Sequence, residues 1–121
     1  MQNTEIAFLY RDASNYKRLT THVVKGEITE TQKKKLLDSL ECYDERTGFG
    51  YCIPEQLGIE IDRFDEYEQD EDDHCWAEVY SDDIKPSDEE PTLYMDINEL
   101  VEKFVSIGST GWGDVKYVVI A

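Results

Sequence analysis

The sequence predicts a single α+β domain in which two helices cover one face of a largely antiparallel sheet of four to five strands. Two runs rich in β-branched and aromatic residues stand near the N-terminus, and turn-forming residues separate them. Two later segments carry apolar residues at helical spacing behind a helix-capping residue. A chain of 121 residues is long enough for one domain with a core and too short for two, so we expect residues 1–121 to form one unit.

The two β-rich runs are TEIAFLYR at 4–11 and RLTTHVVK at 18–25. Between them, DASNYK supplies Asp, Ser and Asn, which favour a turn. We expect a β-hairpin. The first helix should follow Gly26, because Thr29 stands three residues before Gln32 in the spacing of a capping box. Apolar residues then recur at helical spacing and extend this predicted helix over 30–43: Leu36, Leu37, Leu40 and Tyr43.

The middle of the chain gives weaker signals. Residues 44–73 contain several breakers and no sustained period, which predicts a loop with one short helical turn at PEQL, 54–57. HCWAEVY at 74–80 alternates like a strand, with Cys75, Ala77 and Val79 on one face and Trp76, Glu78 and Tyr80 on the other. The next segment, 81–91, reads as an acidic loop.

The C-terminal part predicts the clearest helix. TLYM at 92–95 is expected to be a short strand, after which Asp96 is a good N-cap with Glu99 at the third helical position. One apolar stripe follows and ends at Gly108: Ile97, Leu100, Val101, Phe104 and Val105. STGWG should form a turn, and DVKYVVIA at 114–121 a final strand.

The charge of the chain is concentrated in one segment. The whole sequence has 28 acidic and 12 basic residues, a net charge of −16, and residues 59–90 alone hold fifteen acids and two bases. Since 40% of the chain is hydrophobic, these acids belong to a folded domain and not to a disordered chain. Self-repulsion on this scale exceeds what solubility requires, which favours a binding surface over an acidic face that is merely solvated.

We interpret the acidic segment as a surface that imitates a nucleic-acid backbone and binds a basic protein. Carboxylates at alternate positions of a strand would lie about 6.6 Å apart, and the aromatic residues among them, Tyr67, Trp76, Tyr80 and Tyr94, would anchor a partner. A nuclease, a restriction complex or a CRISPR effector has a suitable basic channel; a neutraliser of a basic toxin would use the same residues. The candidate partner-binding residues are Asp65, Glu66, Glu68, Asp70, Glu71, Asp72, Asp73, Trp76, Asp82, Asp83, Asp88, Glu89 and Glu90.

No catalytic signature stands in the sequence, and neither a cofactor nor a metal is expected. An EF-hand loop counted from Asp70 would place Cys75 where Gly is needed and Ser81 where Glu is needed. The potential zinc ligands lack paired spacing: His22, Cys42, Cys52, His74 and Cys75. GSTGWG at 108–113 follows a helix and lacks the lysine of a P-loop. The enzyme alternative is a small metal-dependent or Cys/His hydrolase that uses His74, Cys75 and nearby carboxylates.

Charge and hydropathy also indicate where the protein acts. Only Lys33–Lys35 form a basic run, so direct binding to nucleic acid is disfavoured, and an acidic domain is repelled by anionic lipid surfaces. The N-terminus lacks a secretory signal, and no apolar stretch reaches membrane-spanning length. We expect a cytoplasmic protein whose three cysteines are free thiols; the oligomeric state stays open.

Four blocks of the chain, YRDASNYK (10–17), GEIT (26–29), IPEQLG (53–58) and DDHCW (72–76), together resemble a group of small, acidic bacterial proteins of uncharacterised function. The resemblance covers about the first two thirds of the chain. It implies a bacterial, phage or mobile-element origin and a cytosolic setting. It also counts against the nucleic-acid mimic, because blocks that recur in the group would form a shared fold or a housekeeping binding site; the anti-defence role, such as anti-CRISPR, is inferred from the acidic segment alone. It implies no activity, cofactor or catalytic residue.

Overall fold

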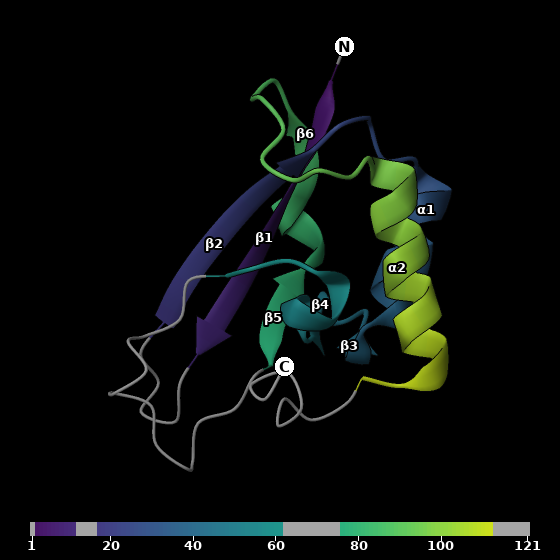
Figure 1. Cartoon of the computed structure of the whole chain (residues 1–121). Helices are drawn as coiled ribbons and strands as arrows, with labels where there is room; N and C mark the ends of the chain where they lie inside the picture. The colour runs from purple at the N-terminus through teal and green to yellow at the C-terminus, as the bar shows by residue number, and fades with distance from the viewer. Residues whose placement is uncertain (1, 12–16, 62–75, 113–121) are drawn as a thin grey trace.

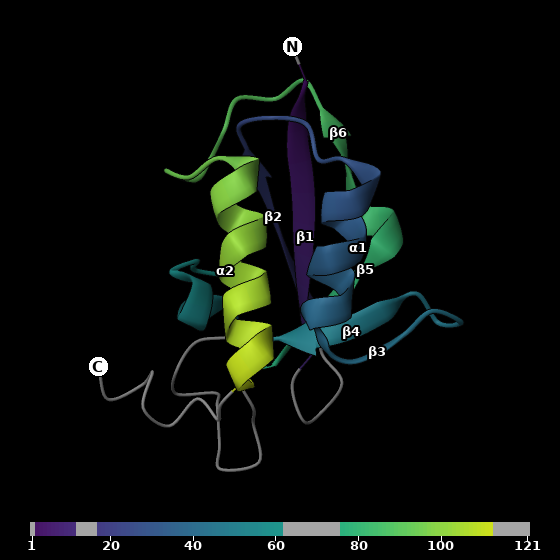
Figure 2. The same ribbon diagram turned by 90° about the vertical axis from the view of Figure 1, so that its right-hand side faces the viewer.

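The computed structural model describes residues 2–11, 17–61 and 76–112, and confirms an α+β fold (Figure 1). Two helices, α1 (Glu30–Ser39) and α2 (Ile97–Thr110), pack side by side against one face of a sheet (Figure 2). Within the described residues the sheet has six strands, where the sequence predicts four to five, and every pairing between them is antiparallel. The strands are β1 (Asn3–Arg11), β2 (Lys17–Val24), β3 (Glu41–Asp44), β4 (Phe49–Cys52), β5 (Ala77–Tyr80) and β6 (Ile84–Ser87).

Strand β1 organises the sheet, whose order is β2-β1-β5-β4-β3. The predicted hairpin is confirmed, because β1 pairs with β2 from Thr4↔Val24 to Arg11↔Lys17. On its other side β1 pairs with two short strands placed end to end. Strand β6 pairs with the beginning of β1, at residues 3–6, and β5 pairs with its end, at Leu9 and Tyr10. A single 3-10 turn, η3 (Ser81–Asp83), joins β5 to β6.

The core lies between the helices and the sheet. Ile6 and Phe8 of β1 are fully buried and belong to the same cluster as Leu100 and Phe104 of α2. Alternate residues of a strand point to opposite faces, so Leu9 and its partner Glu78 lie on the face away from the helices. Neither of the described helices covers this face, which is called the open face below.

Both helices begin where the sequence predicts. The Thr29 hydroxyl accepts a hydrogen bond of 3.1 Å from the Gln32 amide, and the Gln32 side chain accepts one of 3.0 Å from the Thr29 amide. This reciprocal pair is the predicted capping box. At the start of α2, the Asp96 carboxylate accepts a 2.9 Å bond from the Glu99 amide. The short turn predicted at PEQL is also present, as η1 (Pro54–Leu57).

The predicted end of the first helix is wrong. We expected residues 30–43, but α1 ends at Ser39, Leu40 is extended, and residues 41–44 form β3. Tyr43 has the spacing of a helix stripe, yet sheet pairing with β4 overrides that local pattern. The pairing is close: a Cβ added to Gly50 of β4 would lie 2.7 Å from the Leu40 Cβ.

Four further expectations from the sequence are wrong. Residues 44–73 were expected to form no strand, but Phe49–Cys52 is β4; residues 81–91 contain η3 and β6 instead of only a loop. Residues 92–95 form no strand of their own, since Thr92 instead bonds to the edge of β2 at Val23. Helix α2 passes Gly108 and ends at Thr110. The strand expected at 114–121 lies outside the described residues.

Candidate functional site

The structure describes six of the thirteen candidate binding residues. Trp76, Asp82, Asp83, Asp88, Glu89 and Glu90 are described. The other seven lie outside the described residues: Asp65, Glu66, Glu68, Asp70, Glu71, Asp72 and Asp73. The site described below therefore consists of the six described candidate residues and of the strands and turns around them.

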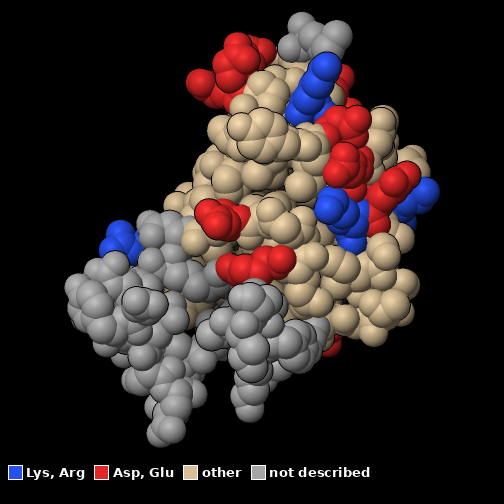
Figure 3. Space-filling model, viewed as in Figure 1, with Lys and Arg blue, Asp and Glu red and all other residues tan. Residues whose placement is uncertain are grey.

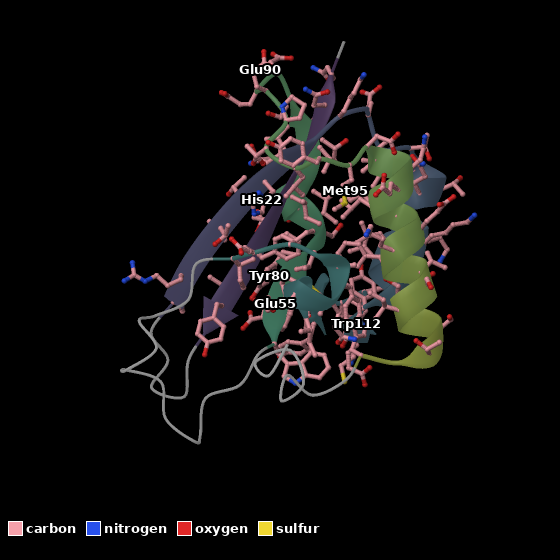
Figure 4. The ribbon with its side chains drawn as sticks, viewed as in Figure 1. His22, Glu55, Tyr80, Glu90, Met95 and Trp112 are labelled. Carbon is pink, nitrogen blue, oxygen red and sulfur yellow. The ribbon has the colours of Figure 1, made fainter. Side chains whose placement is uncertain are left out.

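Five of these residues flank β6 and form the surface that we call the acidic edge: Asp82, Asp83, Asp88, Glu89 and Glu90. All but Asp83 are exposed, and Asp83 is half-buried. Figure 4 places Glu90 at the beginning of β1, at the end of the sheet opposite to Trp112. In the same view, Figure 3 shows acidic side chains gathered at that end of the molecule. Two groups of sequence neighbours, one on each side of β6, thus lie along one side of β1.

Local hydrogen bonds hold both parts of the acidic edge. Before β6, the Ser81 amide donates a 2.7 Å bond to the Gly48 carbonyl, which ties η3 to the β3–β4 turn. After β6, the buried Ser87 hydroxyl accepts a 3.1 Å bond from the Glu89 amide, and the Asn3 side-chain amide donates a 2.9 Å bond to the Glu89 carbonyl. Because these contacts use backbone atoms of residue 89, its carboxylate remains available to solvent.

Two lysines stand between the two acidic groups. The Lys85 ammonium lies 3.6 Å from the Glu5 carboxylate, and the Lys33 ammonium donates a 3.1 Å bond to the Ile84 carbonyl. The acidic edge is therefore interrupted, with about 16 Å of strand between Asp83 and Asp88. From the sequence we expect carboxylates at alternate positions of a strand. None of the five acids of the acidic edge lies in a strand. The acid on β5, Glu78, is only 7% exposed.

Trp76 lies apart from the acidic edge. It immediately precedes β5, which pairs with the end of β1, and it lines a cavity of about 280 Å³ together with Glu41, Cys42 and Tyr51. Of these, Glu41 and Tyr51 were missed as binding candidates, because Glu41 was expected in the first helix and Tyr51 in a loop. The alternation of Phe49 and Tyr51 around Gly50 is the signal that could have found Tyr51.

The cavity continues into an aromatic cluster on the open face. The Phe49 and Tyr80 rings stack with their centroids 4.7 Å apart, and Phe49 meets Tyr51 edge-on at 5.7 Å. The Tyr80 hydroxyl donates a 2.6 Å hydrogen bond to the Glu78 carboxylate. The open face therefore combines aromatic rings with a buried carboxylate, whereas the acidic edge is charged and largely exposed.

A second cavity, of about 390 Å³, lies between α1 and β3 and has mixed charge. Burial, followed by the nearby Glu45 and Asp38 carboxylates, raises the pKa of the Tyr43 hydroxyl above its ordinary value. Tyr43 is therefore neutral at physiological pH. Lys33 and Lys34 line the same cavity as Asp38 and Glu45, so its walls favour neither sign of ligand.

His22 was a potential zinc ligand in the sequence, and the structure gives it a structural position. Its Nδ1 lies 3.0 Å from the Thr92 hydroxyl, and its Nε2 lies 2.9 Å from the Glu60 carbonyl, to which it donates. The Thr92 hydroxyl also accepts a 2.8 Å bond from the Val23 amide. The ring thus joins β2 to two segments that are distant in sequence.

We expect Thr92→Val to lower the free energy of unfolding by about 1–2 kcal/mol, because the Val23 amide and the His22 ring both lose a partner. Thr92→Ser keeps the hydroxyl and should recover most of that loss. Urea unfolding followed by circular dichroism measures both variants. Equal stability of the Val and Ser variants would contradict the role given to the hydroxyl.

The cysteines differ from one another. Cys52 is fully buried, whereas Cys42 is exposed and is a free thiol. His74 and Cys75, the pair invoked by the enzyme alternative, lie outside the described residues. Within the part of the chain that the structure describes, no group of three or more His, Cys, Asp or Glu side chains is placed to hold a metal ion.

Comparisons of the chain with protein-family models, curated proteins and solved structures gave no match. None of the helices in the described ranges combines the length and the apolar character needed to cross a membrane. Functional interpretation therefore depends on the geometry of the acidic edge and the open face.

Proposed function

We propose that this protein is a non-enzymatic inhibitor that binds a basic, nucleic-acid-binding protein through its acidic surface. One observation carries the proposal: carboxylates on both sides of β6 lie along a single side of β1, and Ser87 and Asn3 hold the backbone of the group that follows β6. Within the described part of the chain, no lysine or arginine forms an ion pair with any of the five acids. These carboxylates repel one another, and a basic partner relieves that repulsion.

The interaction is expected to be driven by charge complementarity. Opposite potentials raise the association rate and favour basic partners over all others, and both effects weaken as salt rises. The acids would occupy positions in a basic channel that phosphates otherwise take, so that bound inhibitor and nucleic acid exclude each other. A nuclease, restriction complex or CRISPR effector in the cytoplasm is the proposed target, and a phage or mobile element the proposed origin.

A pair of matched variants tests the acidic edge. The edge variant carries Asp82→Asn, Asp88→Asn, Glu89→Gln and Glu90→Gln. The control variant carries Glu27→Gln, Glu45→Gln, Glu60→Gln and Glu102→Gln, which are exposed acids elsewhere. Each set removes four charges and takes the net charge from −16 to −12. Since an exposed charge pair contributes a few tenths of a kcal/mol to about 1 kcal/mol, the edge variant should bind its partner at least about tenfold more weakly.

The measurement starts from the immobilised protein, nuclease-treated bacterial lysate and elution in salt steps. The proposal predicts that a basic nucleic-acid enzyme is retained, that duplex DNA displaces it, and that the control variant retains it far better than the edge variant. Equal retention by the two variants would assign the effect to net charge alone and reject the acidic edge as the site. A retained basic protein that does not bind DNA would instead indicate a toxin neutraliser.

A further inference from the structure

We propose that the cavity between Tyr51 and Trp76 on the open face binds an arginine side chain of the basic partner. This inference rests on the proposed function, because it assumes a basic protein partner, and it adds the chemical group that this partner inserts. The register of the sheet places aromatic rings and carboxylates next to one another.

Tyr51 lies between two acids on the same face of the sheet. In the register of β3, β4 and β5, Tyr51 is paired with Glu41 on one side and with Glu78 on the other. Directly paired residues share a face and have Cβ atoms about 4.5–5.5 Å apart. An aromatic ring therefore stands between two carboxylates, and the exposed member, Glu41, borders the cavity.

Trp76 closes the other side of the cavity. It lies two residues before Glu78 on the same side of the chain, which makes it the diagonal neighbour of Tyr51. Both rings are half-buried, and the cavity of about 280 Å³ between them is open to solvent. Strand β3 is irregular here, with a register shift between Glu41 and Asp44 and a positive φ of 57° at Cys42. The irregular strand brings Glu41 and Cys42 to the cavity wall.

These walls select a cation, and among cations they select arginine. The faces of Trp and Tyr rings attract positive charge through their quadrupoles. A guanidinium group is planar, stacks on such rings, loses its hydration more easily than an ammonium group and can bond a carboxylate with two parallel hydrogen bonds. A lysine would keep more of its water, and an anionic ligand would meet the carboxylate of Glu41. The net charge of −16 adds a field that draws the same group.

The cavity and the acidic edge can engage one partner together. Strand β5 meets β1 at Tyr10 and β6 ends opposite Asn3, which are about 23 Å apart along β1. A standard protein interface spans that distance. The exposed acids would steer the partner, while the desolvated arginine in the cavity would act as a hot spot.

Hexa-arginine and hexa-lysine peptides test the inference, because they carry the same charge and differ in the cationic group. Their dissociation constants are measured by fluorescence anisotropy at low salt against the full chain. A guanidinium group stacks on aromatic rings and loses its water more easily than an ammonium group, so hexa-arginine should bind more tightly, by up to the roughly two- to fivefold that a cation over an aromatic face adds in affinity. Tyr51→Leu and, separately, Glu41→Gln should remove the preference for arginine. Glu41 is exposed, so its substitution tests the cavity even if Tyr51→Leu disturbs the fold.

The thiol of Cys42 reports occupancy directly. In a Cys75→Ser background, Cys42 is the exposed thiol of the described residues and Cys52 is fully buried. Hexa-arginine should slow alkylation of Cys42 by iodoacetamide, and hexa-lysine should slow it less. Equal protection by both peptides, together with an unchanged arginine preference in Tyr51→Leu and Glu41→Gln, would overturn the inference.

The two proposals fail in different ways. If both peptides bind equally and only the four edge substitutions weaken them, the acidic edge keeps its support and the arginine cavity is rejected. If neither peptide binds at low salt, both proposals are rejected. If the Tyr51 variant loses its preference for arginine while the edge variant binds like the control, the cavity stands and the acidic edge does not.

Discussion

Replacing Trp112 by Ala should lower the free energy of unfolding by about 4 kcal/mol, the largest effect that we expect of a single substitution. The indole is 9% exposed and packs edge-on against Phe104 of α2, with ring centroids 5.9 Å apart. Its Nε1 donates a 2.9 Å hydrogen bond to the carbonyl of Ser39, the last residue of α1. The substitution leaves a cavity and also removes a partner from a helix-terminal carbonyl.

Two further variants separate these contributions. Trp112→Phe keeps a ring beside Phe104 but loses the N–H group, so it should cost about 1–2 kcal/mol from the hydrogen bond and the smaller ring. Tyr94→Ala removes a fully exposed aromatic residue and should change stability by less than about 0.5 kcal/mol. Guanidinium unfolding followed by far-ultraviolet circular dichroism measures all three. A loss below about 1.5 kcal/mol for Trp112→Ala would show that the surroundings collapse onto the vacated site.

The elements that local sequence signals specify were predictable. Thr29 with Gln32, and Asp96 with Glu99, satisfy backbone groups within one turn of the chain, so each helix start can be read from a few residues. The first hairpin follows from two β-rich runs around a turn, because both partners are close in sequence. These features, with the apolar stripe of α2, are sufficient for the α+β class.

The short strands could not be predicted, because their stability comes from distant partners. β3, β4 and β6 have four residues each, too few to establish a period of two. β6 exists because residues 84–87 pair with the beginning of β1, more than 75 positions earlier. Tyr43 has helical spacing from Leu36, and only pairing of β3 with β4 decides against a helix there.

The candidate site also combines features that local sequence shows with features that depend on distant partners. The acidity of residues 82–90 is visible in the composition, although the structure was needed to place those acids on one border of the sheet. The cavity combines Glu41, Tyr51 and Trp76 from three separate segments, and no local pattern brings them together. A binding pocket on a sheet is a property of register, which the sequence does not state where strands are short.

The two faces of the sheet have different roles, one in stability and the other in the proposed binding. The helix-covered face holds the core, the His22 contacts and the Trp112 anchor, whereas the open face and the β6 side carry the proposed contacts with a partner. Substitutions between the helices should therefore change stability and leave peptide binding unchanged in the folded fraction. Gly108 offers the sharpest test of that separation.

Gly108→Ala should lower the free energy of unfolding by about 2 kcal/mol, although alanine is the better helix former by about 1 kcal/mol. A Cβ at Gly108 would lie 2.7 Å from the Ser39 carbonyl oxygen and 2.8 Å from the Ser39 Cβ, so α1 and α2 must move apart. Ser109→Ala introduces the same residue type at an exposed neighbour and should be neutral or slightly stabilising. If Gly108→Ala were as stable as the parent, the helix contact would be loose enough to absorb a methyl group.

Because Gly108 and Trp112 both contact Ser39, their substitutions should not be additive. A helix displaced by the Gly108→Ala substitution already weakens the indole hydrogen bond, so the double variant should lose less stability than the sum of the two single losses. The folded double variant should still prefer hexa-arginine to hexa-lysine, since the cavity at Tyr51 lies on the opposite face of the sheet. Strict additivity would mean that the two residues act on separate parts of the helix contact; loss of the arginine preference would mean that the two faces are coupled through the sheet.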